Sequence, residues 1–287
     1  MLISSIDMNN GTYRRLEDAT RITNNLGVSI VRISAALFFG FLMGIAAGLI
    51  GVGGGEFRIP ILLYVLGLPI ITAIAVNLLV GLLTVVVSFL RRFQLGLFNE
   101  HVVNVALVMS LGSILGSYLG ATLTGKIPEK PLKKALAILL VIIGLKIGLE
   151  PFIHMPPLFQ FILGPTEETI LAGLMGIIIG VISGLLGVAG GEFRIPTLIY
   201  LFGFDIVIAG TTSLLVSIPT VAMGFTKHHQ MGHINRNATI IAIIMGVGSI
   251  LGALIGASYA GVIDKDILKM LLGIILVMAT VRMVTKP

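Results

Sequence analysis

A stretch of ten residues that carries an acid, a base and several glycines occurs twice in the chain. Gly51-Val-Gly-Gly-Gly-Glu-Phe-Arg-Ile-Pro60 returns as Gly187-Val-Ala-Gly-Gly-Glu-Phe-Arg-Ile-Pro196, at a shift of 136 residues. Successive amides without side chains can converge on an anion, and a helix that begins there adds its positive dipole end. Arg58 and Arg194 supply forked donors that suit oxyanions. Both copies therefore predict binding of a small anion.

Polar side chains at a second pair of equivalent positions could complete the ligand cage. Asn77 and Ser213 are related by the same shift, and Thr211 and Thr212 precede the second of them. Hydrogen bonding between helices, worth roughly 1 kcal/mol per bond, is an equally supported alternative for these side chains. The predicted anion-binding residues are Gly53, Gly54, Gly55, Arg58, Asn77, Gly190, Gly191, Arg194, Thr212 and Ser213.

The composition places these motifs in a membrane. The 287 residues are 56% hydrophobic and 11% charged, whereas soluble domains carry about 25% charged residues. Apolar runs of about twenty residues, the length that a helix needs to cross the hydrocarbon core, recur from Ser29 onward. Leu136 to Leu145 shows no alternation of polar and apolar residues, which excludes a barrel strand. We therefore expect an all-α polytopic membrane protein.

In this setting each glycine stretch predicts a broken helix. Glycine and proline interrupt regular hydrogen bonding, and broken helices in corresponding positions of two repeats indicate the binding site of a transporter. Glycines that only let helices pack closely are the alternative interpretation. Two copies that each carry a charged pair favour a functional site, because buried charge in a membrane is costly. Glu56 and Glu192 either form ion pairs with the neighbouring arginines or titrate and couple transport to protons.

The duplication extends over most of the chain, since the same shift pairs Gly112-Ser-Ile-Leu-Gly116 with Gly248-Ser-Ile-Leu-Gly252. The predicted domains are an N-terminal cytoplasmic tail (1–28), a first transmembrane repeat (29–149), an extracytoplasmic linker (150–168) and a second transmembrane repeat (169–287). Helical segments are predicted at about Ile30–Ile50, Ile59–Leu68, Ile71–Leu90, His101–Leu123, Leu132–Leu149, Ile170–Leu186, Ile195–Phe204, Ile206–Phe225, Ala238–Ala260 and Ile267–Val284.

The distribution of basic residues predicts the topology. The basic tail and the Lys126–Lys134 loop, with four lysines and one glutamate, belong in the cytoplasm, and the linker without positive charge belongs outside. An odd number of crossings per repeat, most simply five, gives inverted repeats with about ten transmembrane segments, each repeat containing a broken or short helix. Arg91 and Arg92 fall on the wrong side of this arrangement. Short elements that dip in and return would make the repeats parallel instead.

The sequence predicts no enzyme, cofactor or metal site. There is no cysteine, so thiol catalysis and disulfides are excluded. The glycine stretch is neither a dinucleotide fingerprint nor a P-loop, and Ser183 does not lie in a nucleophile elbow. His228, His229 and His233 have no acid or cysteine beside them, which favours a solvated basic loop over a metal site. The net charge of +6 is interpreted as loop bias rather than a nucleic-acid surface.

Taken together, these residues resemble the sulfite exporter TauE/SafE family of membrane permeases. The resemblance runs from about Val31 to Val284 and is carried by the two glycine motifs, by Ala75-Val-Asn77-Leu with Thr211-Thr-Ser213-Leu, and by the paired Gly-x-x-x-Gly runs. It implies a multi-pass permease of the cell membrane that moves sulfite, sulfonates or related small organic anions, generally outward. The chain departs from the common pattern in its Glu-Phe-Arg sequences and in Asn77, where the family often has serine.

The sequence thus predicts a secondary transporter for a small anion, with the lipid bilayer as its other partner, no nucleic acid, and a homo-oligomer left open. A cation-coupled carrier or channel that uses Glu56 and Glu192 is the first alternative. An intramembrane enzyme or a scaffold is the second.

Overall fold

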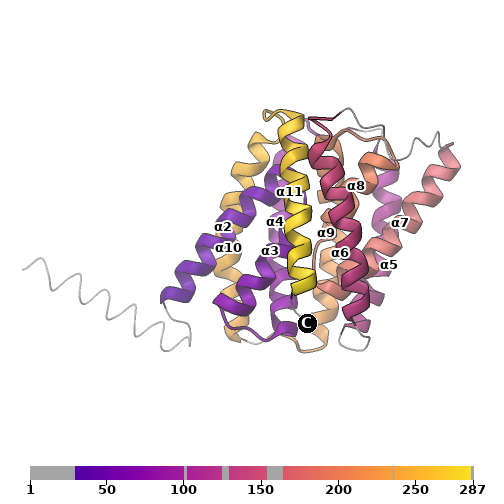
Figure 1. Cartoon of the computed structure of the whole chain (residues 1–287). Helices are drawn as coiled ribbons and strands as arrows, with labels where there is room; N and C mark the ends of the chain where they lie inside the picture. The colour runs from indigo at the N-terminus through magenta and orange to yellow at the C-terminus, as the bar shows by residue number, and fades with distance from the viewer. Residues whose placement is uncertain (1–29, 100–101, 125–128, 154–163, 235, 286–287) are drawn as a thin grey trace, which may run out of the picture.

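The computed structural model describes residues 30–99, 102–124, 129–153, 164–234 and 236–285, and every regular element within these ranges is a helix (Figure 1). The predicted tail and residues 154–163 of the predicted linker lie outside the described residues. The elements are α2 (Ile30–Ile50), α3 (Gly55–Pro60), the π-helical segment η1 (Ile61–Val65), α4 (Ile70–Gln94), α5 (Val103–Leu123), α6 (Glu129–Leu149), α7 (Pro165–Leu186), α8 (Gly191–Tyr200), α9 (Ile206–Gln230), α10 (Arg236–Tyr259) and α11 (Lys265–Thr285).

Each predicted helical segment corresponds to one of these elements, except Ile59–Leu68, which covers the end of α3 and η1, and the two short helices begin earlier than predicted. α3 begins at Gly55 and α8 at Gly191, so the two Glu-Phe-Arg sequences lie inside the helices rather than before them. Pro60 and Pro196 follow within the same helices. The prediction began these helices at Ile59 and Ile195, whereas here each helix forms its opening turn from the glycine and the charged pair.

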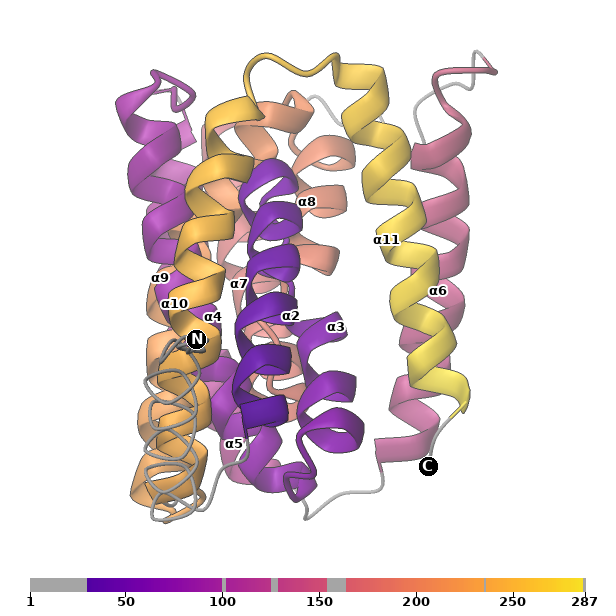
Figure 2. The same cartoon turned by 90° about the vertical axis from the view of Figure 1, so that its left-hand side faces the viewer.

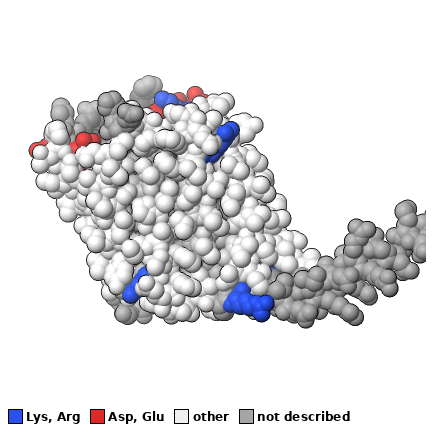
Figure 3. All heavy atoms as spheres, turned by 180° about the vertical axis from the view of Figure 1, so that it is seen from behind, with Lys and Arg blue, Asp and Glu red and all other residues white. Residues whose placement is uncertain are grey.

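Six of the described helices are long and apolar enough to cross a membrane: α2, α4, α5, α7, α9 and α10. On the face shown in Figure 3, the charged side chains lie at the two ends of the molecule, and a broad band between the ends carries none. The helical class and the presence of several spans are therefore confirmed. The count of about ten segments and the inverted arrangement stay predictions.

Two helix pairs, α2 with α10 and α5 with α7, pack through rows of glycines that contact the backbone of the partner helix, here called glycine seams. Between α2 and α10, a Cβ added at Gly40 or Gly44 would lie 2.3 Å from a backbone oxygen of the partner helix. Between α5 and α7, a Cβ at Gly116 or Gly120 would lie 2.2 Å from such an oxygen. Small residues permit this close approach of helices in membranes. Each seam joins one helix of the first repeat to one helix of the second.

The remaining helices surround the short ones. α4 and α9 pack against each other, and they also contact α10 and α5, respectively. α3 lies against α4, and α8 lies against α9. α6 and α11 pack together and stand at one side of the bundle (Figure 2). This arrangement buries the first turns of α3 and α8 between longer helices.

Candidate functional site

The two glycine stretches meet inside the described fold, and their contacts are reciprocal. A Cβ added at Gly191 would lie 2.5 Å from the oxygen of Val52, and one added at Gly55 would lie 3.4 Å from Cα of Val188, the counterpart of Val52. Gly53 faces its own counterpart, since a Cβ there would lie 2.6 Å from Cβ of Ala189. An exchange of partners between equivalent positions is what a two-fold relation produces. The breaks of the two repeats therefore form one structural unit.

Left-handed glycines set the start of both short helices. Gly54 and Gly190 precede α3 and α8 with φ of 70° and 78°. Residues with a Cβ adopt this region only at a cost, whereas glycine enters it freely. The turn into each helix consequently depends on these two residues, and it directs the charged pair that follows into the protein.

Arg58 is fully buried, and each of its side-chain nitrogens donates to a protein oxygen. Nε donates to Oδ1 of Asn77 at 2.9 Å, and Nη2 donates to the carbonyl of Gly53 at 2.6 Å. Nη1 donates to the hydroxyls of Thr84 and Ser249, at 3.1 and 3.3 Å. A buried polar group is stable only when it is bonded in this way. The guanidinium ties α3 to α4 and α10.

Arg194 is also fully buried, but its guanidinium is bonded on one side only. Nη1 donates to the carbonyls of Ala189 and Ser213, at 3.3 and 3.2 Å, and to the hydroxyl of Ser217 at 2.6 Å. Nε and Nη2 have no hydrogen-bond partner among the residues that the structure describes. These two nitrogens form the side edge of the guanidinium, which can bind two oxygens of one group at once.

Asn77 and Ser213 bind the glycine stretch of the opposite repeat. Asn77 Nδ2 donates to the carbonyl of Gly187 at 2.6 Å, and the Ser213 hydroxyl donates to the carbonyl of Gly51 at 3.3 Å. Both side chains hold the two breaks together, as the hydrogen-bonding alternative predicted. Thr212 is buried, and its hydroxyl has no partner within the described part of the chain.

Glu56 and Glu192 lie next to each other at the junction of the two repeats. Both are buried, and their carboxyl groups are close enough to interact by hydrogen bonding and by charge repulsion. Each also interacts electrostatically with the arginine two residues later, Arg58 or Arg194. The paired glycine breaks led us to expect the two stretches at one site, but the sequence did not show that the two acids, 136 residues apart, would interact with each other.

Arg92 was missed as a structural residue. It is fully buried, and it donates from Nε to the carbonyl of Gly48 at 3.0 Å and from Nη2 to that of Leu49 at 2.7 Å. Nη1 donates to the hydroxyl of Thr211 at 3.1 Å. The last carbonyls of a helix lack intrahelical partners and carry partial negative charge, so the guanidinium stabilises the end of α2. Arg92 therefore lies in the last turn of α4 as a buried structural residue, and the predicted topology, with Arg91 and Arg92 on its wrong side, stays a prediction.

The expectation of a solvated loop was wrong for His228. This residue occupies the position equivalent to Arg92, in the last turn of α9, and it is buried. Its Nδ1 lies 2.9 Å from Nδ1 of His233, and the neighbouring His229 stacks on Phe225. Within the described ranges, no group of three or more His, Cys, Asp or Glu side chains is placed to hold a metal.

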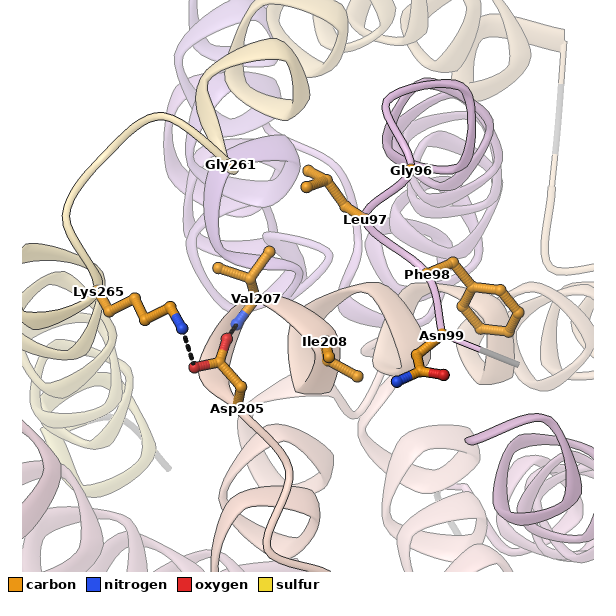
Figure 4. A pocket seen from close by; sticks show the side chains of 9 residues that line it. All are labelled: Gly96, Leu97, Phe98, Asn99, Asp205, Val207, Ile208, Gly261 and Lys265. Carbon is orange, nitrogen blue, oxygen red and sulfur yellow. Dashed lines mark hydrogen bonds and ion pairs between the residues drawn. The ribbon is translucent and has the colours of Figure 1, made fainter. Parts of the chain in front are cut away.

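A cavity of 630 Å³ lies away from the glycine stretches, at the ends of α4 and α10 and the start of α9 (Figure 4). Asp205 accepts from the Val207 amide at 3.0 Å and pairs with Nζ of Lys265 at 2.9 Å, so the lysine charge points to a protein partner (Figure 4). The predicted anion-binding residues do not line this cavity. Its lining consists of Gly96, Leu97, Phe98, Asn99, Asp205, Val207, Ile208, Gly261 and Lys265.

Comparison with known proteins gives one family and one relative. The family described as "Sulfite exporter TauE/SafE" matches residues 10–147 and 164–287. A "Probable membrane transporter protein YunE" of Bacillus subtilis (strain 168) is 26% identical over 101 residues, which is 35% of this chain and 36% of the relative. The match thus spans about a third of the length of that relative. No solved structure matches.

Proposed function

Because the chain belongs to the sulfite exporter TauE/SafE family of membrane transporters, we propose that it is a secondary transporter for a small anion such as sulfite, a sulfonate or a related organic anion. The protein is a multi-pass membrane protein with several apolar helices. The proposed direction of transport is outward, and the proposed activity involves no enzyme chemistry.

The observation that carries this proposal is the pair of buried arginines at the meeting point of two glycine breaks. Arg58 and Arg194 are both fully buried in the helical bundle. Cationic side chains in a membrane interior are expensive and usually mark the path of an ion or a substrate. Paired breaks in corresponding positions of two repeats are the common plan of a transporter binding site. Thr212, with its unbonded buried hydroxyl, is the proposed polar residue beside this site.

We further propose inverted repeats with about ten membrane segments, the short helices included. The reciprocal contacts between the two glycine stretches support a two-fold relation of the repeats. The N-terminal tail is proposed to face the cytoplasm, and the linker around Pro156 the outside. On the face in Figure 3, acidic side chains gather at one end only, so the two ends of the molecule differ in charge.

Single cysteines introduced into this cysteine-free chain at the linker or near Lys130 test the orientation by labelling. A linker that is labelled only from the cytoplasmic side contradicts the proposal.

The decisive experiment is flux in reconstituted vesicles. The purified chain is placed in liposomes that are loaded with radiolabelled sulfite, methanesulfonate or acetate, and release is compared with release from protein-free vesicles. We expect saturable, protein-dependent flux of at least one anion, and competition among anions that share the site. Turnover of a substrate without flux would favour an enzyme, and flux of cations alone would favour a cation channel.

The acidic pair supports proton coupling as an addition to this function. Glu56 and Glu192 are buried, and each interacts by charge with the arginine two residues later, so a proton taken up or released there would change the charge beside the proposed anion site. Flux of the anion driven by an imposed proton gradient would support coupling. Flux that is indifferent to the gradient would leave Glu56 and Glu192 as structural groups.

A further inference from the structure

The two arginines of the candidate site are equivalent in sequence but not in hydrogen bonding. We propose that the anion binds at Arg194 only, with the Nε and Nη2 edge of its guanidinium holding two oxygens of a sulfite, sulfonate or carboxylate group. Arg58 is then a structural residue. This inference rests on the proposed transport of a small anion and places that anion in the second repeat.

The asymmetry comes from one pair of equivalent positions. Asn77 and Ser213 both donate to the first glycine carbonyl of the opposite stretch. Asparagine has a further oxygen, and this oxygen accepts from Nε of Arg58 at 2.9 Å. Serine has one hydroxyl and a shorter side chain, and Nε of Arg194 finds no acceptor among the described residues. The same edge of the guanidinium is thus closed in the first repeat and open in the second.

The remaining donors repeat this difference. Nη2 of Arg58 donates to the carbonyl of Gly53 at 2.6 Å. The counterpart of Gly53 is Ala189, whose carbonyl accepts from Nη1 of Arg194 instead, at 3.3 Å. The guanidinium of Arg194 is therefore turned so that Nη1 carries every protein contact, and both Nε and Nη2 are left over. Glu192 interacts with Arg194 by charge, but neither Nε nor Nη2 has a hydrogen-bond acceptor among the described residues, and a buried donor without an acceptor is destabilising.

The surroundings of this edge suit an anion. Gly190, which precedes α8, lies beside this edge, since a Cβ at this residue would be 3.5 Å from Nη2 of Arg194. α8 has ten residues, and its positive dipole end begins at Gly191. The open edge of the guanidinium and the start of α8 coincide in the second repeat.

Exchanging the two equivalent residues tests the proposal without removing any charge. In Ser213→Asn, the new amide oxygen should accept from Nε of Arg194 as Asn77 does from Arg58. Binding of sulfite or methanesulfonate by the full chain, measured by calorimetry and by vesicle flux, is expected to weaken about tenfold or more. The matched variant Asn77→Ser opens the edge of Arg58, and affinity at Arg194 should stay within about threefold of the original.

If Ser213→Asn disturbs folding, a second pair of variants tests whether the anion binds at Arg194 alone. Lysine keeps the charge but loses the fork. Arg194→Lys should therefore weaken binding about tenfold or more, whereas Arg58→Lys should lower the melting temperature with binding changed less than about threefold. Equal loss in both lysine variants, or normal binding in a folded Ser213→Asn protein, overturns the single-site inference. If the unaltered protein neither binds nor moves any of the anions, the proposed function itself fails.

Discussion

Removing the guanidinium of Arg92 should destabilise the protein without touching the candidate anion site. Arg92 bonds the last carbonyls of α2 through two nitrogens and reaches α9 through the third. In Arg92→Met, an apolar side chain of similar length fills the space, and the carbonyls of Gly48 and Leu49 lose their donors. No backbone amide of α2 can replace the lost guanidinium donor at these two carbonyls, because α2 ends at Ile50.

The size of the effect follows from those two carbonyls. An unsatisfied buried acceptor costs about 1–3 kcal/mol, so the two together cost about 2–6 kcal/mol. At roughly 2 °C per kcal/mol for a chain of this size, the melting temperature should fall by about 4–12 °C. Arg92→His should cost less, because the second repeat already uses a histidine, His228, at the equivalent position.

Thermal unfolding of the detergent-purified protein, followed by size-exclusion chromatography after heating, measures this difference. Arg91→Met is the matched control, since Arg91 makes one described side-chain bond, to the Ser258 hydroxyl at 2.8 Å, and is only partly buried. The control should lower stability by less than about 1 kcal/mol. Equal shifts in the two variants would show that Arg92 does not stabilise the end of α2.

Three further outcomes can be measured. Gly44→Val should prevent close packing of α2 on α10, because a Cβ at this residue would lie 2.3 Å from a backbone oxygen of α10, and the yield of monodisperse protein should fall sharply. Gly148→Ala is the control and should purify normally, because a Cβ at Gly148 would lie 3.5 Å from its nearest neighbouring atom. Glu56→Gln and Glu192→Gln remove the two acidic groups beside the arginines and keep their size, so anion flux should persist and no longer follow an imposed proton gradient, whereas unchanged dependence on the gradient would exclude these acids as the coupling groups. Asp205→Ala removes the cap of α9 and should cost about 1 kcal/mol in thermal unfolding.

The helices were predictable because their signals are local. Apolar runs of sufficient length gave every long helix to within a few residues, and α2 was predicted at its observed bounds. The glycine repeat also located the junction of the two halves. The short helices begin before the predicted Ile59 and Ile195, because the left-handed Gly54 and Gly190 set the helix start ahead of the charged pair.

The polar network was not predictable because its members are distant in sequence. Ser249 and Thr84 approach Arg58 from two other helices, and no local pattern distinguishes them from other small polar residues. The bonds of Arg92 were missed, since its acceptors lie at the end of a helix that stops more than forty residues earlier. The difference between Asn77 and Ser213 was visible in the sequence, but its effect on the two guanidinium groups depends on side-chain geometry.

The glycine seams make the two halves of this chain dependent on each other for folding. The first helix of each repeat, α2 or α7, finds its closest partner in the other repeat, α10 or α5. A domain-swapped dimer exchanges helices between its two subunits in a similar way. Either half made alone would display an unpaired row of glycines to the lipid. Two halves made as separate chains should rebuild the complete bundle by exchanging these helices.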